Sequence, residues 1–142
     1  GTLAGGFLSD RWLGEAEPVN LANRSLIKYK LMIDEAGGWE LFQELLRTLA
    51  AVARRHDTTI ATVASRWVLD QPRVAAVIIG ARNAAHVDRY AGLFRLALDE
   101  QDRAAIAAVR SQLQVPADDV FDLERDKDGR HGSIMKYNLN AD

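Results

Sequence analysis

The sequence predicts an α/β fold, and three stretches of the chain carry that prediction. Residues 74–79 form a short, uninterrupted run of small and β-branched apolar residues, which is typical of a strand buried on both faces, as in a parallel sheet. Apolar residues recur at three- and four-residue steps over 39–55 and again over 59–70, which indicates two amphipathic helices. Because strand-like and helix-like segments alternate, we expect helices packed on a parallel sheet.

The N-terminal part predicts a strand end, a loop and a short helix. Residues 1–8 have the pattern of a strand end that runs into a glycine loop. The polar stretch 14–24 predicts a second loop. Ser25 is a candidate N-cap for a helix over 25–33, because its hydroxyl can accept a hydrogen bond from the first turn. Gly37 and Gly38 would end that helix.

The second half continues the alternation. Pro72 ends the helix over 59–70, because proline lacks the N–H of the next turn and clashes with the turn before it. A loop over 80–83 follows the predicted strand, and helices are expected over 84–93 and from Leu98 to about residue 113.

We divide the 142 residues into a domain over 1–115 and a tail over 116–142. Asp128-Gly129 is a strong turn signal, so the tail predicts a hairpin that pairs 120–125 with 133–137 and is ordered against the domain. Two predicted strands cannot form a sheet that is covered on both faces. We therefore expect the rest of the sheet to come from a longer protein.

Charge and composition exclude several classes of function. The chain has 18 Lys and Arg against 20 Asp and Glu, a formal net charge of −2. This balance argues against a nucleic-acid binder, which would carry a basic stripe. The absence of cysteine excludes disulfides, thiol nucleophiles and thiolate metal sites. No targeting or membrane-spanning segment is evident, so we expect a cytoplasmic protein without a membrane partner.

Three local patterns imitate functional motifs and are set aside. Ser25 and Lys28 have the spacing of penicillin-recognising enzymes, but the partner motifs are absent. Residues 124–129 imitate the start of a calcium loop, but Met135 stands where a bidentate glutamate is needed. His56 adjoins no nucleophile and has the pattern of a helix end, where a cationic side chain suits the dipole.

The stretch Val77-Ile78-Ile79-Gly80-Ala81-Arg82-Asn83-Ala84-Ala85-His86-Val87 resembles the last strand and cofactor loop of the aldo/keto reductases. Three further segments, 59–69, 98–102 and 1–11, resemble the family's penultimate helix, the start of its final helix and its seventh strand. The resemblance implies a (β/α)8 TIM barrel, of which this chain would supply the last two β/α units plus a C-terminal extension.

The resemblance also implies an activity, namely reduction of aldehyde, ketone or sugar carbonyls by hydride transfer from NADPH. The family's catalytic Asp, Tyr, Lys and His lie in the first half of the barrel, upstream of Gly1, so no catalytic residue is assigned here. The implied partners are a small carbonyl substrate and the missing N-terminal half, and the chain alone should be inactive. The alternative is a non-catalytic half-barrel that binds or regulates another protein.

Two loops carry the implied cofactor contacts. The loop at 80–83 opens a helix, and helix N-termini favour phosphate groups. Arg82 would lie near the adenine ribose phosphate, or it is a solvated charge at the start of a helix. The family has Gln or Arg at the position of His86 and Asn at the position of Tyr90, so the preference of this chain for NADP over NAD stays open. Tyr90 either stacks on adenine or packs under the loop. The residues that the resemblance assigns to cofactor binding are Leu3, Gly5, Gly6, Arg11, Gly80, Ala81, Arg82, His86 and Tyr90.

Overall fold

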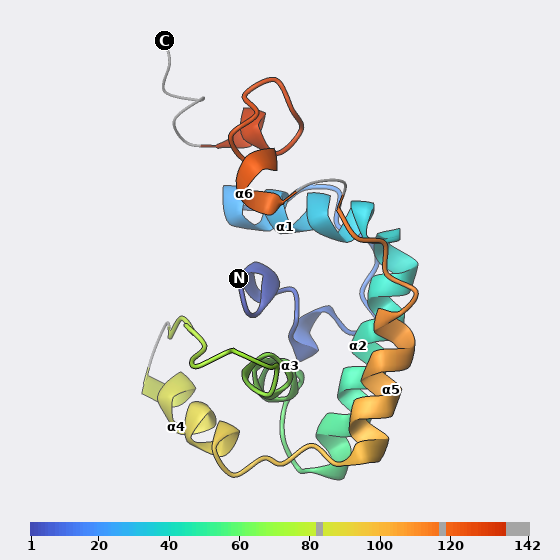
Figure 1. Ribbon diagram of the computed structural model, residues 1–142, viewed down its shortest axis with the longest axis vertical. Helices are drawn as coiled ribbons and strands as arrows, with labels where there is room; N and C mark the ends of the chain where they lie inside the picture. The colour runs from blue at the N-terminus through green and yellow to red at the C-terminus, as the bar shows by residue number, and fades with distance from the viewer. Residues whose placement is uncertain (82–83, 117–118, 136–142) are drawn as a thin grey trace.

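The computed structural model describes residues 1–81, 84–116 and 119–135, and this part of the chain is helical. Helices α2 (Gly38–Arg55) and α5 (Glu100–Arg110) run antiparallel along one side of the molecule, α3 (Ile60–Leu69) packs on α2, and α4 (Ala84–Leu93) packs on α3 (Figure 1). The helices are α1 (Arg24–Glu35), α2 (Gly38–Arg55), α3 (Ile60–Leu69), α4 (Ala84–Leu93), α5 (Glu100–Arg110) and α6 (Val120–Leu123), with short 3-10 turns η1 (Ala4–Gly6), η2 (Asp10–Trp12) and η3 (Gly132–Ile134).

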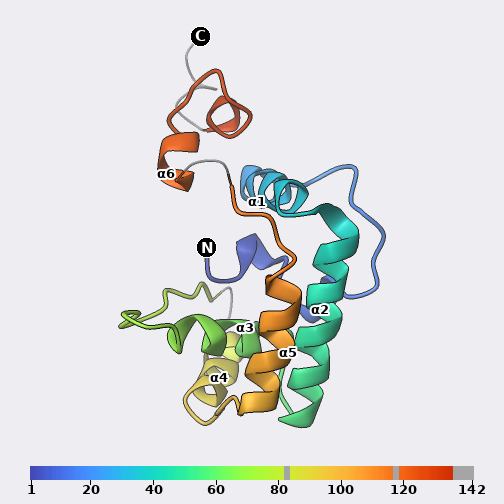
Figure 2. The same ribbon diagram turned by 45° about the vertical axis from the view of Figure 1, so that its right-hand side comes forward.

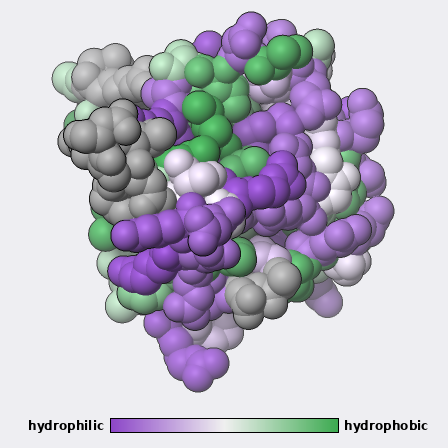
Figure 3. Space-filling view, turned by 90° about the horizontal axis from the view of Figure 1, so that it is seen from above, coloured by the Kyte–Doolittle hydropathy of each residue, from purple (hydrophilic) through white to green (hydrophobic). Residues whose placement is uncertain are grey.

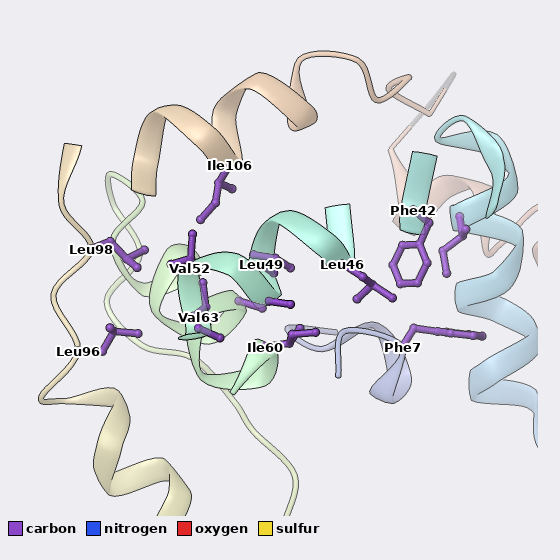
Figure 4. Close-up of a cluster of buried hydrophobic side chains, with 14 of the residues drawn as sticks. Phe7, Phe42, Leu46, Leu49, Val52, Ile60, Val63, Leu96, Leu98 and Ile106 are labelled. Carbon is purple, nitrogen blue, oxygen red and sulfur yellow. The ribbon is translucent and has the colours of Figure 1, made fainter. Parts of the chain in front are cut away.

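The amphipathic helix predicted over 39–55 is confirmed as α2, and its apolar stripe forms the centre of the core. Leu46 and Val52 on α2 are buried, and they pack in one cluster with Val63 of α3 and Ile106 of α5 (Figure 4). Phe7 extends this cluster toward the N-terminus and is fully buried. The core therefore joins the N-terminal turn to the helices that follow it.

Side-chain caps fix where three helices begin. The Thr59 hydroxyl accepts a 3.3 Å hydrogen bond from the Thr62 amide at the start of α3. Asp99 and Asp102 form a reciprocal capping box at the start of α5. At the start of α1 the carboxamide of Asn23 accepts a 3.0 Å bond from Leu26. The expectation that Ser25 caps this helix is therefore wrong, because Asn23 has the extended backbone of a cap.

Both strand predictions are wrong for this structure, since the described residues contain no strand. Residues 74–81 have no regular secondary structure and pair with no strand among the described residues, and Ile78, predicted to be buried, is 93% exposed. The other predicted strand, residues 1–8, is not a pairing partner for residues 74–79, because Ala4, Gly5 and Gly6 all have positive φ, which is incompatible with a strand. Without a partner strand, the high β propensity of residues 74–79 is not enough to form a strand.

The predicted hairpin in the tail is also wrong. Residues 120–123 form the short helix α6, whose first turn is capped by the Asp119 carboxylate through a 2.8 Å bond from the Phe121 amide. A local cap of this kind favours a helical turn over a strand. The expectation that the tail is ordered is confirmed over 119–135, which packs on α1 (Figure 2), and residues 136–137 of the hairpin prediction lie outside the described part.

The surface is mixed in character. Figure 3 views the end of the molecule that carries α1 and the C-terminal extension, and it shows apolar side chains between hydrophilic ones. In the described part of the chain, no helix is both long and apolar enough to cross a membrane.

Candidate functional site

A cavity of about 660 Å³ lies between the N-terminal turn, the start of α1, the start of α3 and the segment before α4. Each predicted cofactor residue whose side chain the structure describes lines it. These residues are Leu3, Gly5, Gly6, Arg11, Gly80, Ala81 and Tyr90. The fold therefore brings both predicted loops, which are about 70 residues apart in the chain, to one site. Arg82 lies outside the described residues, as does the side chain of His86 on α4.

The first loop is a tight turn rather than a strand end. Gly5 and Gly6 have φ values of 64° and 102°, and the Gly6 amide donates a 2.9 Å bond to the Leu3 carbonyl. The Ser9 hydroxyl closes the turn with a 2.7 Å bond to the Gly6 carbonyl. Glycine is required at these φ values because a side chain would be strained. The turn thus offers bare backbone to the cavity.

Helix α1 supplies a wall of the cavity that the sequence reasoning did not assign. Ser25, Leu26 and Tyr29 all line it. A Cβ at Gly5 would lie 2.8 Å from Cδ2 of Tyr29, so the turn and the ring are in close contact. The spacing of Ser25 and Tyr29, one helical turn apart, puts them on the same face. That spacing alone could not have shown that this face meets the glycine turn.

Among the described residues, positive groups line the cavity from three sides, beside one carboxylate, that of Asp10. The first turns of α1 and α3 both border it, through Asn23 and Thr59 respectively. Helix N-termini present unpaired amide donors and the positive end of the dipole. The exposed Arg11 adds a cation, and its guanidinium carbon lies 5.2 Å from the centroid of the Trp12 ring. The arrangement can hold a phosphate or pyrophosphate group.

The second loop is fastened to the helix that follows it. The Tyr90 hydroxyl on α4 donates a hydrogen bond to the Gly80 carbonyl. Of the two alternatives for Tyr90, this contact favours packing under the loop over stacking on adenine. A Cβ at Gly80 would meet no other protein atom within 4 Å, so the space beside this backbone is open. Gly80 is thus held through its carbonyl, and the space beside its Cα is open.

A second cluster of ionisable groups lies away from the cavity. The buried Asp102 carboxylate contacts Arg55 Nη1 at 2.5 Å and His56 Nε2 at 2.6 Å, and Arg55 Nη2 reaches Asp99 at 2.7 Å. The hydrogen bond from the Asp102 amide, and then Arg55, lowers the pKa of Asp99. His56 and the two acids are close enough to hold a cation, but Arg55 already pairs with both acids. The cluster is therefore a link between α2 and α5.

Another hollow, of about 700 Å³, lies beside the start of α2 and contains no predicted site residue. Its buried Gln43 accepts a 2.8 Å bond from the Gly14 amide and donates one of 2.8 Å to the Trp12 carbonyl. Trp39 Nε1 donates to the Glu15 carbonyl at 3.0 Å. The side chains of Gln43 and Trp39 therefore bind the backbone of the loop after η2, and this structural role accounts for their polar groups.

Comparison with known proteins gives one match. The family model described as the aldo/keto reductase family matches residues 1–111. No curated protein and no solved structure matches the chain. The match includes both loops of the cavity and covers well over half of the sequence. The chain is therefore a member of the aldo/keto reductase family, which indicates an oxidoreductase that uses a nicotinamide cofactor.

Proposed function

We propose that this chain forms the cofactor-binding part of an NADPH-dependent oxidoreductase that reduces aldehyde, ketone or sugar carbonyls. The observation that carries the proposal is the meeting of Leu3, Gly5 and Gly6 with Gly80 and Ala81 around one cavity. These residues come from the two segments that resemble the family's cofactor loops. Family membership supports the oxidoreductase class and small carbonyl substrates.

The residues present fit a dinucleotide. The first glycine turn would lie along the pyrophosphate, because Gly5 and Gly6 place no side chain between backbone and ligand. Arg11 and the first turns of α1 and α3 would balance the phosphate charge. Arg82 would pair with the 2′-phosphate, and the open space beside Gly80 would admit the adenosine end. When bound, NADPH supplies the hydride.

The proposal assigns the proton donor to another part of the protein. None of Tyr29, Tyr90 and Tyr137 stands in the family's catalytic motif, and we assign no catalytic role to them. Residues 74–81 are apolar, partly to fully exposed and paired with no strand among the described residues, as expected of a strand position in a larger barrel. The N-terminal part of the barrel is thus the proposed partner, the chain alone is inactive, and a cytoplasmic location is part of the same proposal.

Fluorescence titration of the complete protein with NADPH, followed by carbonyl-dependent oxidation of bound NADPH, tests this function. We expect saturable binding and turnover with at least one class of aldehyde, ketone or sugar. An absence of NADPH binding would contradict the proposal. Binding without turnover across the carbonyl panel would favour the non-catalytic module instead.

A further inference from the structure

The C-terminal extension, residues 119–135, contacts one face of α1 at two points. Glu124 forms an ion pair with Lys28, and both side chains are partly buried, at 17% and 26% exposed respectively. His131 is 4% exposed, and its Nε2 lies 2.9 Å from both carboxylate oxygens of Glu35. Lys28 and Glu35 are seven residues apart, which places them two turns apart on the same face of the helix. The extension therefore contacts α1 at two positions that lie two turns apart.

The extension is built to present these two side chains. A Cβ at Gly132 would collide with the Asp126 backbone, so glycine lets the two segments of the extension meet. The Gly129 amide donates a 3.0 Å bond to the Asp126 carbonyl and closes the turn between them. Glu124 before this turn and His131 after it both reach α1. The C-terminal extension is thus a folded unit rather than a loose tail.

A continuous set of contacts runs from the extension to the cavity. The Lys28 ammonium that pairs with Glu124 lies 5.6 Å from the centroid of the Tyr29 ring. Tyr29 in turn packs against Gly1 and Gly5 of the first glycine turn and lines the cavity. The buried Phe7 anchors the end of this turn in the core, whereas Gly5 has no side chain and lies against the Tyr29 ring.

We propose that the C-terminal extension positions Tyr29 against the first glycine turn and so sets the affinity of the cavity for its dinucleotide, with Glu124 and Lys28 as the positioning residues. The affinity step rests on the proposed function. The pair orders the Lys28 side chain beside the ring, where a cation interacts favourably with the π face. Loss of Glu124 frees Lys28 to leave the ring for water, and Tyr29 then holds the turn less firmly.

Amide hydrogen exchange measures this coupling without any cofactor. The amides of Gly6, Phe7 and Leu8 are hydrogen-bonded within the turn, to the carbonyls of Leu3, Ala4 and Leu3 respectively. In the complete protein, Glu124→Gln and Lys28→Met should each speed exchange at these amides by about two- to fivefold, the range expected for a partly exposed pair. The double variant should exchange no faster than either single variant.

A matched control lies on the same helix. Lys30 also forms ion pairs with acids, with Glu17 at 2.6 Å and with Asp34, but it does not pair with Glu124 of the extension. Lys30→Met should leave exchange of the turn unchanged. Unchanged exchange in the Glu124 and Lys28 variants, or equal acceleration by Lys30→Met, would overturn the inference.

Titration with NADPH and NADH tests the affinity step. Glu124→Gln and Lys28→Met should weaken both cofactors by the same factor, about two- to fivefold, at an unchanged melting temperature, because the turn meets the pyrophosphate that both share. Faster exchange with unchanged affinity would overturn the proposed role in binding. A parent protein that binds neither cofactor would refute the proposed function, whereas the exchange measurement would still decide whether the extension holds the turn.

Discussion

The Thr2 hydroxyl donates a 3.4 Å hydrogen bond to the carbonyl of Ile78, which joins the first residues of the chain to the segment before α4. Both residues line the same cavity, together with the glycine turn and Gly80. In a parallel sheet, loops that follow neighbouring strands meet at one edge. The contact shows that these two segments are neighbours even though neither forms a strand here, and it brings the proposed cofactor loops together.

A bulkier residue at Gly80 should block the cavity without disturbing the fold. A Cβ there meets no protein atom within 4 Å, and the backbone of Gly80 does not have a positive φ. We expect Gly80→Val to weaken NADPH and NADH alike by about tenfold or more, the equivalent of ~1.4 kcal/mol, with the same melting temperature. Gly92→Val is the matched control, because Gly92 is equally unobstructed but does not line the cavity. Normal cofactor binding by Gly80→Val would place the ligand elsewhere.

Arg82→Ala should separate the two cofactors. If the guanidinium pairs with the 2′-phosphate, the charge-assisted hydrogen bond contributes about 1.5–3 kcal/mol. The variant should then bind NADPH about 10- to 150-fold more weakly, since each 1.4 kcal/mol is tenfold. NADH lacks that phosphate, so its dissociation constant should stay constant in the same fluorescence titration. Equal losses of affinity for both cofactors would mean that Arg82 stacks on adenine or shapes the loop. Unchanged affinity for both would mean that Arg82 is a solvated charge that does not contact the cofactor.

The helices could be predicted from the sequence because their signals are local. The apolar spacing from Trp39 to Val52 determines which face of α2 is buried, whatever packs against it. Pro72 and the capping residues of α5 act within one turn of the chain. The cap of α1 was misplaced by two residues because Asn23 and Ser25 are both good caps, and only the backbone conformation decides between them.

The lack of strands in the described residues and part of the site could not be predicted in the same way, because both depend on contacts between distant segments. A β-branched run such as 74–79 becomes a strand only when another strand offers its hydrogen-bonding edge. The two loops proposed to bind the cofactor are predicted from their resemblance to family motifs, but no motif marks Tyr29. Its place in the cavity follows from the docking of α1 on the glycine turn, which is a tertiary contact.

Removal of the Asp102 carboxylate should destabilise the protein. Asp102 is fully buried and accepts hydrogen bonds from Arg55, His56 and the Asp99 amide. We expect Asp102→Ala to lower the free energy of unfolding by about 1.5–3 kcal/mol, since it removes the capping box of α5 and the charged acceptor shared by Arg55, His56 and the Asp99 amide. Urea denaturation measures the change. Glu100→Ala is the control, because this exposed residue in the first turn of α5 should cost only about 0.5–1 kcal/mol. Similar losses for the two variants would show that the buried network adds nothing.

Acid should weaken the link between α3 and α5 at Asp70. Burial raises the pKa of this carboxyl, but the hydrogen bonds from Arg66 and Arg103 outweigh burial and hold the pKa below its ordinary 3.8. The unfolded chain therefore binds this proton at a higher pH than the folded chain does, so stability from this group is complete above 3.8 and is lost as pH falls below it. Urea denaturation between neutral pH and pH values below 3.8 should show a smaller acid-induced loss in Asp70→Asn than in the parent. Asp122→Asn, which alters an exposed carboxyl on α6, is the control and should follow the parent curve. An unchanged acid dependence in Asp70→Asn would show that the Arg66 and Arg103 contacts do not stabilise the ionised carboxyl.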